Sequence, residues 1–424
     1  MTNVIELLKK NKRVDDYRIN LSEKESYELF FVKGKLETVR RTHTVDKQVT
    51  VYVNHGEFKG HATFLIYPST TMEEIEAEIE QCVEKALLID NQKYELPANQ
   101  QGQFVVESNF HGQSLNDIAS VIADAVFRAQ GESKTSLNSV EVFVNQVKGT
   151  VINSRGIDKT QVRYAAMVEA IPTYNGAEES VELYQQYNFN DLNEETITSE
   201  IAGKLLEVKA RFEAKKPKEE LSGKVILNKQ ELSTLFANIT GELHYQTVYS
   251  KSNVFKKGDM IQKDRTGDPL NISMVGEVPN NIGSAKFDGD GMALTDIQLV
   301  KDGQAVAYYG DNRFGQYLGE TPTGNLGCTI VEAGSACTKC LSKAPYLEVI
   351  SMSGLQVDTN NDYIGGEVRL AYYNDGQTII PVTGISITGK LSEVLSSMRL
   401  STEIATDNSY VGPKKAILEG MKIF

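Results

Sequence analysis

Residues 346–354 read YLEVISMSG, residues 365–376 read GGEVRLAYYNDG, and further strand signals follow at residues 381–383 and 387–391. The first stretch is rich in the β-branched and aromatic residues that favour strands, and it ends in small residues that favour a turn. The second alternates apolar and polar side chains until it reaches an Asn-Asp-Gly turn. This order predicts antiparallel strands joined by short turns.

The chain has 424 residues, which is more than one compact core holds, because single cores stop growing near roughly 250 to 300 residues. Helix patterns and strand patterns are segregated along the chain rather than alternating, which is typical of the α+β class. Residues 215–220 are charged and contain Pro217, which disfavours continuing a helix and marks a domain boundary. We therefore expect α+β subdomains at residues 1–90 and 111–215, followed by a strand-rich domain at residues 224–424.

The first half of the chain shows strand signals between capped helices. Thr71 and Glu74 form a capping-box pattern ahead of an amphipathic helix, and Ser114 caps a second helix. Residues 90–110 are polar and aperiodic, so we expect a linker there. Gly149 is expected in a turn between two strands. A hairpin is expected at residues 47–64, with its tip at residues 54–56. The expected strands are residues 27–32, 139–147, 150–153, 161–170 and 180–187, and the last helix of this half is expected at residues 194–214.

Composition excludes several classes of function. The formal net charge is −13 and the pI is near 5.1, whereas nucleic-acid-binding surfaces cluster Lys and Arg against phosphates, so no direct nucleic-acid contact is expected. No run of about twenty apolar residues suits a membrane span, and residues 1–13 lack the apolar centre of a secretory signal, so we expect a cytoplasmic protein. The cysteines are too few for a disulfide framework: Cys82, Cys328, Cys337 and Cys340.

The spacing of the histidines indicates whether the chain can bind zinc through a helical motif. A helical zinc-peptidase motif needs two imidazoles one turn apart and a carboxylate that acts on the bound water. Glu242 and His244 come nearest to such a pattern, and without a second imidazole they are interpreted as a polar segment after the helix expected at residues 230–239. The sequence predicts no metal site in this chain, since no two of its five histidines are three or four positions apart: His43, His55, His61, His111 and His244.

Three further patterns bear on chemistry, and none is assigned as catalytic. Cys337 and Cys340 form a Cys-x-x-Cys pair, but no second pair or nearby His completes a zinc site, so we expect a structural role. Residues 287–291 read FDGDG, which lacks the ligand spacing of an EF-hand. Ser351 and Ser353 lack a Gly-x-Ser-x-Gly elbow, and no His follows them to act as a base.

The strand and turn order of the last eighty or so residues resembles the C-terminal domain of the TldD/PmbA family, once named as proposed modulators of DNA gyrase and now regarded as a peptidase system. In its catalytic TldD branch, the helix after the domain boundary carries His-Glu-x-x-x-His, and a cysteine near the C-terminus is the third zinc ligand. Here residues 232–241 read LSTLFANITG and residues 408–413 read NSYVGP. The chain is therefore similar to the TldE/PmbA branch, which lacks the zinc ligands.

The resemblance also implies a cleft. The family has a Phe-Asp-x-Glu-Gly-type segment where this chain has FDGDG, so Asp288 and Asp290 are expected in a rigid turn that lines the cleft, with Asp290 in place of the usual Glu. Ser353, Gly354 and Glu367 are further candidates for lining it. No residue is assigned a catalytic role, and zinc is expected in a TldD-type partner rather than in this chain.

The resemblance implies a non-zinc-binding subunit of a TldD/TldE-type metallopeptidase complex that acts on unfolded or precursor peptides. Extended peptide substrates are expected to dock by strand addition to a sheet edge. Two alternatives stay open: a stand-alone peptidase whose metal ligands come from distant positions, and a non-enzymatic modulator that binds a partner protein such as DNA gyrase. The isolated chain is expected to form a homodimer.

Overall fold

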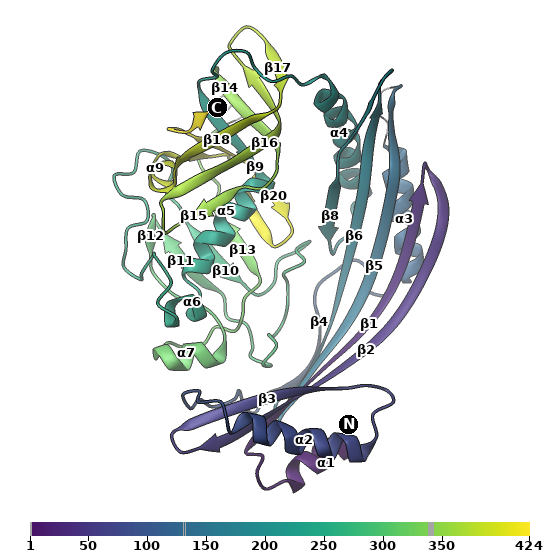
Figure 1. The fold of residues 1–424 in the computed structure, drawn as a ribbon, viewed down its shortest axis with the longest axis vertical. Helices are drawn as coiled ribbons and strands as arrows, with labels where there is room; N and C mark the ends of the chain where they lie inside the picture. Colours follow the sequence, from purple (N-terminus) through teal and green to yellow (C-terminus); the bar gives the residue numbers. More distant parts are fainter. Residues whose placement is uncertain (1, 130, 132, 338–342) are drawn as a thin grey trace.

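A computed structural model describes residues 2–129, 131, 133–337 and 343–424. It confirms the α+β class, with three sheets and a strand-rich C-terminal region. Figure 1 shows a long curved sheet beside a compact C-terminal body, with the N-terminus at the far end of that sheet. The Cys-x-x-Cys pair falls partly outside the described residues, because Cys340 is not among them.

One eight-stranded sheet dominates the N-terminal half, and four of its strands are long and antiparallel (Figure 1). The pairing of β1 with β5 is unbroken from Arg18 opposite Asn153 to Val32 opposite Ser139. The strand order is β3 (Phe58–Ile66), β2 (Lys35–His55), β1 (Asp16–Val32), β5 (Thr135–Asn153), β6 (Asp158–Asn175) and β4 (Gln101–Val105), and both β7 (Ser180–Glu182) and β8 (Gln185–Phe189) also pair with β6. The expected three-part division of the chain stays a prediction.

Two local expectations differ from the structure. The segment expected as a linker contains β4, which pairs in parallel with β6. Gly149 lies inside β5 rather than in a turn, because it pairs with Ser22 on one side and with Gln161 on the other. Pairing with strands distant in the sequence decides both cases, and it outweighs the local preference of glycine for turns.

Helices cover one face of this sheet. α1 (Thr2–Lys10) and α2 (Met72–Ala86) pack at one end, and α3 (Leu115–Arg128) and α4 (Glu194–Glu213) pack at the other. The two predicted caps are confirmed. The Thr71 side chain accepts a hydrogen bond from the Glu74 backbone N–H, and the Glu74 side chain accepts one from the Thr71 backbone N–H. Ser114 caps α3. Such caps satisfy N–H groups that the first helical turn leaves unpaired.

The opposite face of the sheet is largely polar. Side chains alternate between the two faces of a strand, and on β5 the residues Val140, Val142 and Val144 lie under the helices. On the other face, Arg18 and Asn20 of β1 are followed by Ser22, and Gln161 lies opposite Gly149. This polar face is turned toward the C-terminal domain, which covers part of it.

Two further sheets build the C-terminal body. The nine-stranded sheet contains β19 (Arg399–Leu400), β22 (Lys415–Leu418), β9 (Lys224–Asn228), β14 (Tyr346–Met352), β16 (Tyr363–Asn374), β18 (Ile385–Lys390) and β23 (Lys422–Ile423), with β15 (Gln356–Asp358) and β17 (Ile379–Val382) paired to β16. The six-stranded sheet contains β12 (Gln304–Ala305), β11 (Ile297–Lys301), β10 (Ile272–Val275), β13 (Cys328–Val331), β21 (Tyr410–Pro413) and β20 (Ile404–Asp407). The helices of this body are α5 (Lys229–Glu242), α6 (Tyr245–Tyr249), α7 (Asn312–Leu318) and α9 (Leu391–Ser397).

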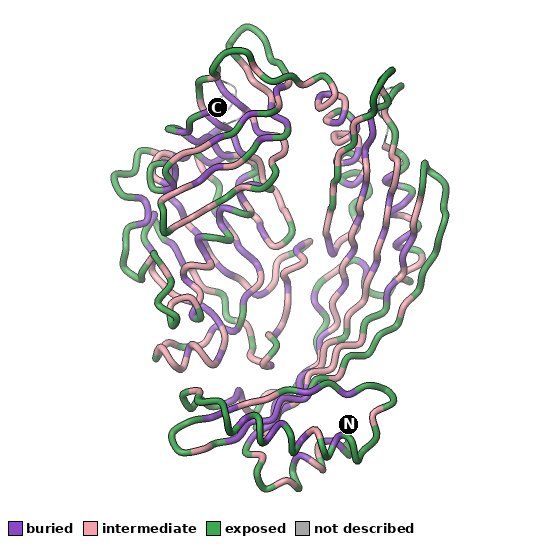
Figure 2. Tube along the Cα trace, in the orientation of Figure 1, coloured by how far each residue is buried: buried purple, intermediate pink, exposed green. Residues whose placement is uncertain are grey.

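Helix α5 joins the two C-terminal sheets. It contacts β9 and β22 of one sheet and β13, β20 and β21 of the other. Its buried side chains Leu232, Leu235, Phe236 and Ile239 belong to the largest apolar core of the chain. Figure 2 shows buried segments concentrated inside this body, whereas much of β2 is exposed. Among the described helices, none is both long and apolar enough to cross a bilayer.

Truncation of Leu235 tests the role of α5. We expect Leu235→Ala to lower the free energy of unfolding by about 2 to 5 kcal/mol, because the side chain is fully buried between the two sheets and leaves a cavity. Chemical denaturation measures the change. Leu206→Ala on α4 is the control, since Leu206 is 54% exposed. A similar loss in both variants would show that α5 does not hold the sheets together.

Candidate functional site

A loop of the C-terminal domain, residues 285–291, rests on the polar face of the N-terminal sheet; we call it the clamp loop. Gln161 on β6 bonds to it in both directions: its Nε2 donates to the Phe287 carbonyl (3.1 Å), and its Oε1 accepts from the Lys286 backbone N–H (2.8 Å). Asn20 on β1 donates to the Gly289 carbonyl (2.8 Å). The sheet therefore fixes the clamp loop through its main chain.

Charged side chains add to this contact. Lys159 on β6 is 4% exposed, and its ammonium donates to the Gly291 carbonyl (3.0 Å). Arg18 on β1 forms an ion pair with Asp290 of the clamp loop. Gly291 has φ +80°, and a Cβ there would come within 2.6 Å of the Ile157 side chain. Both the positive φ and the close packing require glycine at this position.

Asp288 holds the clamp loop in shape. Its Oδ1 accepts hydrogen bonds from the backbone N–H groups of Asp290 (2.9 Å) and Met292 (3.0 Å), and its Oδ2 accepts one from Asn325 (3.0 Å). Burial raises the pKa of Asp288, and the N–H donors from Asn325 and Met292 act in the opposite direction. The carboxylate thus ties one turn to a neighbouring segment.

Two cavities flank the clamp loop, and Asp288, Gly289 and Asn325 line both. The larger has a volume of about 570 Å³ and lies toward Ser22 and Arg163. The smaller, of about 370 Å³, also contains Arg18, Tyr52, His61, Asp290 and Arg313. Sites for small ligands are typically clefts of this size between domains.

The smaller cavity has an aromatic and cationic wall. The Arg313 guanidinium lies over the Tyr94 ring (5.8 Å) and donates to the Asn91 side chain (2.6 Å). Burial lowers the pKa of His61, and the nearby charges of Arg313 and Arg18 lower it further. Sequence reasoning did not find this group. The signal that points to part of it is the alternation of side chains along β1 to β3, which places Arg18, Tyr52 and His61 on the face away from the helices.

His244 is engaged on both ring nitrogens. Its Nδ1 accepts from the Gln246 backbone N–H (3.2 Å) at the start of α6, so Nε2 carries the proton and donates to Asn325 Oδ1 (3.1 Å). The ring packs edge-on against Tyr309. Within the described residues, no group of three or more His, Cys, Asp or Glu side chains is arranged to hold a metal ion.

The remaining expected cleft residues lie elsewhere. Ser353 follows β14, where its hydroxyl donates to Glu367 Oε2 (3.0 Å) and accepts from Arg369 Nε (3.0 Å). Ser353, Gly354 and Glu367 are exposed, and none of them lines either cavity beside Asp288. The structure thus brings Asp288 and Asp290 together and places the other three on a separate surface. A functional role for any of the five stays a prediction.

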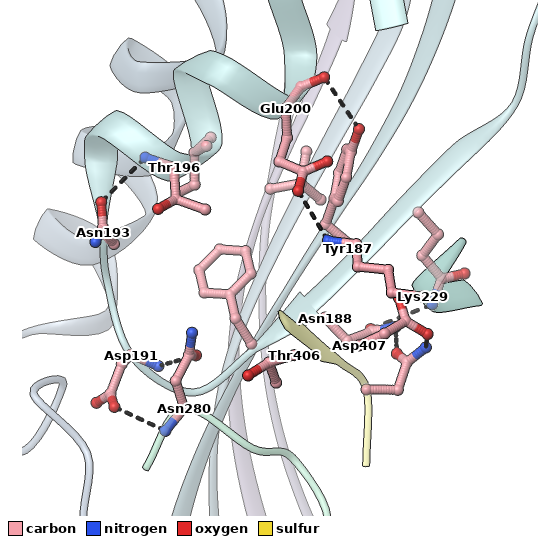
Figure 3. Close-up of a pocket in the computed structure, with 15 residues that line it drawn as sticks. Tyr187, Asn188, Asp191, Asn193, Thr196, Glu200, Lys229, Asn280, Thr406 and Asp407 are labelled. Carbon is pink, nitrogen blue, oxygen red and sulfur yellow. Dashed lines mark hydrogen bonds and ion pairs between the residues drawn. The ribbon is translucent and has the colours of Figure 1, made fainter. Parts of the chain in front are cut away.

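A third cavity, of about 90 Å³, lies where β8, α4, the start of α5 and the end of β20 meet (Figure 3). The Lys229 ammonium forms an ion pair with Glu200 of α4 (2.8 Å). Asn188 of β8 donates to Asn408 Oδ1 (2.8 Å) across the junction between the two halves of the chain. The cavity adjoins both segments in which the resemblance places zinc ligands in the catalytic branch.

Two carboxylates at and near this third cavity, Glu231 and Asp407, have raised pKa values. Glu231 of α5 is 5% exposed, and in the described part of the chain its Oε2 has no hydrogen-bond partner. Burial is the main cause that raises the pKa of Glu231 to about 7; Lys204 lowers it and Asp407 raises it. Burial also raises the pKa of Asp407, against the lowering effect of Lys229. Sequence reasoning missed Glu231, although it lies one helical turn before the buried Leu235.

Comparison with known proteins agrees with the fold. Residues 222–424 match the model of the PmbA/TldA metallopeptidase C-terminal domain. The C-terminal part of the chain is therefore similar to the PmbA/TldD family. A curated relative, the metalloprotease PmbA homolog of Haemophilus influenzae, is 24% identical over 217 residues, which span 46% of this chain and 48% of that protein. The matched stretch therefore covers about half the length of the curated relative.

Solved structures share the fold over almost the whole chain. A proposed modulator of DNA gyrase from Bacteroides thetaiotaomicron matches with a TM-score of 0.80 at 14% identity, covering 99% of this chain and 97% of that one. TldE from Thermococcus kodakarensis matches with a TM-score of 0.78 at 16% identity, covering 100% and 99%. A second proposed gyrase modulator, from Thermotoga maritima, has a TM-score of 0.75 at 15% identity and covers 100% and 99%.

Asp288→Asn tests the clamp loop. We expect it to lower the free energy of unfolding by about 1 to 3 kcal/mol, because an amide nitrogen would face backbone N–H groups that the carboxylate now accepts. Chemical denaturation measures the change. Asp46→Asn removes the same charge beside the same cavity from an exposed side chain. Equal effects from the two variants would show that the hydrogen bonds of Asp288 are unimportant.

Glu231→Gln tests the buried carboxylate through pH. The folded pKa of about 7 lies above the ordinary value of 4.5, so the folded chain holds the proton more tightly between these values, and stability falls as pH rises through this window. We expect the variant to raise the free energy of unfolding at pH 8 by on the order of 2 kcal/mol, with little change at pH 5.

Thermal or chemical unfolding at the two pH values gives this measurement. Glu219→Gln is the matched control, since Glu219 is exposed in the segment before β9. The same gain at pH 5 and pH 8 would attribute the effect to packing, and a loss at pH 8 would show that the ionised form of Glu231 is stabilising.

Proposed function

We propose that this chain is a TldE/PmbA-like subunit without its own catalytic zinc, which joins a TldD-type metallopeptidase subunit in the cytoplasm to degrade unfolded or precursor peptides. The partner supplies the zinc ion and the carboxylate that acts on the bound water. This chain supplies a wall of the chamber in which extended peptides are held. The match of residues 222–424 to the PmbA/TldA metallopeptidase C-terminal domain and the TldE-like fold support the proposal.

The observation that carries the proposal is the Lys229–Glu200 ion pair (2.8 Å) at the third cavity. Lys229 is the first residue of α5, the helix that carries the zinc-binding motif in the catalytic branch. Its ammonium places a fixed positive charge where a divalent cation would otherwise meet Glu200 and Asp407, and like charges at close range repel. Along the same helix, the inward positions Leu232, Leu235 and Phe236 are apolar.

Co-expression with a homologue that carries His-Glu-x-x-x-His tests the proposal. We expect the two chains to co-elute as one complex, to hold stoichiometric zinc and to cleave an unfolded peptide, whereas this chain purified alone holds no stoichiometric zinc. Size-exclusion chromatography, metal analysis by mass spectrometry and a fluorogenic peptide assay give the three readouts. A complex in which the partner's motif is inactivated is the control for cleavage.

Metal analysis and activity of the isolated chain can contradict this proposal. Stoichiometric zinc in this chain alone, together with peptide cleavage that is lost in His244→Ala, would establish a stand-alone peptidase and overturn the proposal. Because both nitrogens of His244 already bond within the chain, the structure predicts that this variant changes neither the zinc content nor the activity of the complex.

A further inference from the structure

Arg163 is a cation without a counter-charge in the larger cavity. It lies on β6, opposite Val147, and belongs to the face turned toward the C-terminal domain. Within the residues that the structure describes, its guanidinium has no hydrogen bond, ion pair or ring contact. Burial lowers its pKa, yet an arginine stays charged in proteins. Arg163 is partly buried, and a partly desolvated charge without a partner favours an anionic ligand.

The floor of the cavity is open. Gly149 lies in the strand beside Gln161, and a Cβ built there has no atom within 4 Å. Val147 and Val151 flank it on the same face and give apolar walls. The strand does not need glycine for its conformation, since the backbone of Gly149 is not in the positive-φ region. The open floor therefore adds free volume beside Arg163.

Charge is distributed unevenly along the cavity. Two carboxylates line the cavity, Asp46 and Asp288. Asp288 already accepts hydrogen bonds from backbone N–H groups, so Asp46 is the carboxylate that faces a ligand. Asp46 lies on β2 and Arg163 on β6, three strand spacings apart, which is roughly 14 Å at about 4.8 Å per strand. One end of the cavity is basic and the other is acidic. A phosphate or polyanion would meet the acidic end unfavourably, whereas a zwitterion matches both ends.

We propose that this cavity binds a short peptide with free ends, whose C-terminal carboxylate contacts Arg163 and whose amino group lies toward Asp46. An extended chain spans about 3.3 to 3.6 Å per residue, so roughly four residues bridge the two ends. The volume of about 570 Å³ is within the range of ligand sites. Guanidinium groups bind carboxylates through two parallel hydrogen bonds, which makes the carboxylate end the specific one.

This inference rests on the proposed function only in taking peptides as the class of ligand, such as the fragments that a peptidase releases. It concerns a site that this chain forms without a partner. Binding is therefore tested on the isolated full-length chain, and complex formation is tested separately. If the isolated chain binds the peptide but forms no complex, the proposed function alone is refuted. If the chain forms the complex but does not bind the peptide in isolation, this inference alone is refuted.

Isothermal titration calorimetry with tetra-alanine tests the site. We expect the free peptide to bind, and its C-terminal amide to bind about 10- to 100-fold more weakly, because the charge-assisted pair with Arg163 is lost. N-acetyl tetra-alanine is expected to bind more weakly as well, by a smaller factor. Arg163→Gln should weaken the free peptide as much as amidation does, and it should leave the amide unaffected.

Two variants separate binding from folding. Gly149→Leu should abolish binding with an unchanged melting temperature, because its side chain fills the open floor, where a Cβ at residue 149 has no atom within 4 Å. Lys148→Gln removes one positive charge from the neighbouring residue, whose side chain points to the opposite face of β5, and should leave binding unchanged. Arg163→Lys, which keeps the charge, should retain part of the affinity.

Several results would overturn the inference. These are equal binding of the free peptide and its amide, an equal loss in Lys148→Gln and Arg163→Gln, no binding of tetra-alanine, or inorganic phosphate displacing the peptide more effectively than acetate does. A large fall in the melting temperature of Arg163→Gln would also contradict it, since an unpartnered cation contributes nothing favourable to the folded state.

Discussion

The hydrogen bonds between Gln161 and the clamp loop are the contact on which the rest of the arrangement depends. Gln161 is 7% exposed, and its amide both donates to and accepts from the main chain of residues 286 and 287. A buried amide that is satisfied on both sides specifies one position of the loop, because any shift leaves a polar atom without a partner. Cavities lie on both sides of the clamp loop, where it leaves parts of the polar face uncovered.

The rest of this junction is also polar and charged. It includes the ion pair of Arg18 with Asp290 and the hydrogen bond of Lys159 to the Gly291 carbonyl. These contacts fix the orientation of the loop and bury little apolar surface. Interfaces of this kind between parts of one chain resemble those of transient complexes, and they hold geometry through a few oriented groups. The long strands of the N-terminal sheet provide the rigid support, since apolar side chains pack under helices on one face and leave the other face for the polar contacts with the clamp loop.

Local signals in the sequence were reliable, and signals that depend on distant pairing were not. The caps at Thr71 and Ser114 could be predicted because a cap involves only the first turn of its own helix. Gly149 could not be placed, because its conformation depends on pairing with β1 and β6. Arg163 and Glu231 were missed for a related reason: whether a charged residue is buried depends on which face its neighbours cover, and this is known only after the strands are ordered.

The third cavity shows how charged side chains are balanced around the packed helix α5. Glu200 and Asp407 line it, Glu231 lies near it, and a pocket with this surplus of negative charge attracts cations. Lys229 supplies a cation that belongs to the chain itself, and its ion pair with Glu200 neutralises part of the surplus. The packing around α5 therefore places a cation of the chain itself among these carboxylates, and for Asp407 the nearby Lys229 lowers the pKa against the larger raising effect of burial.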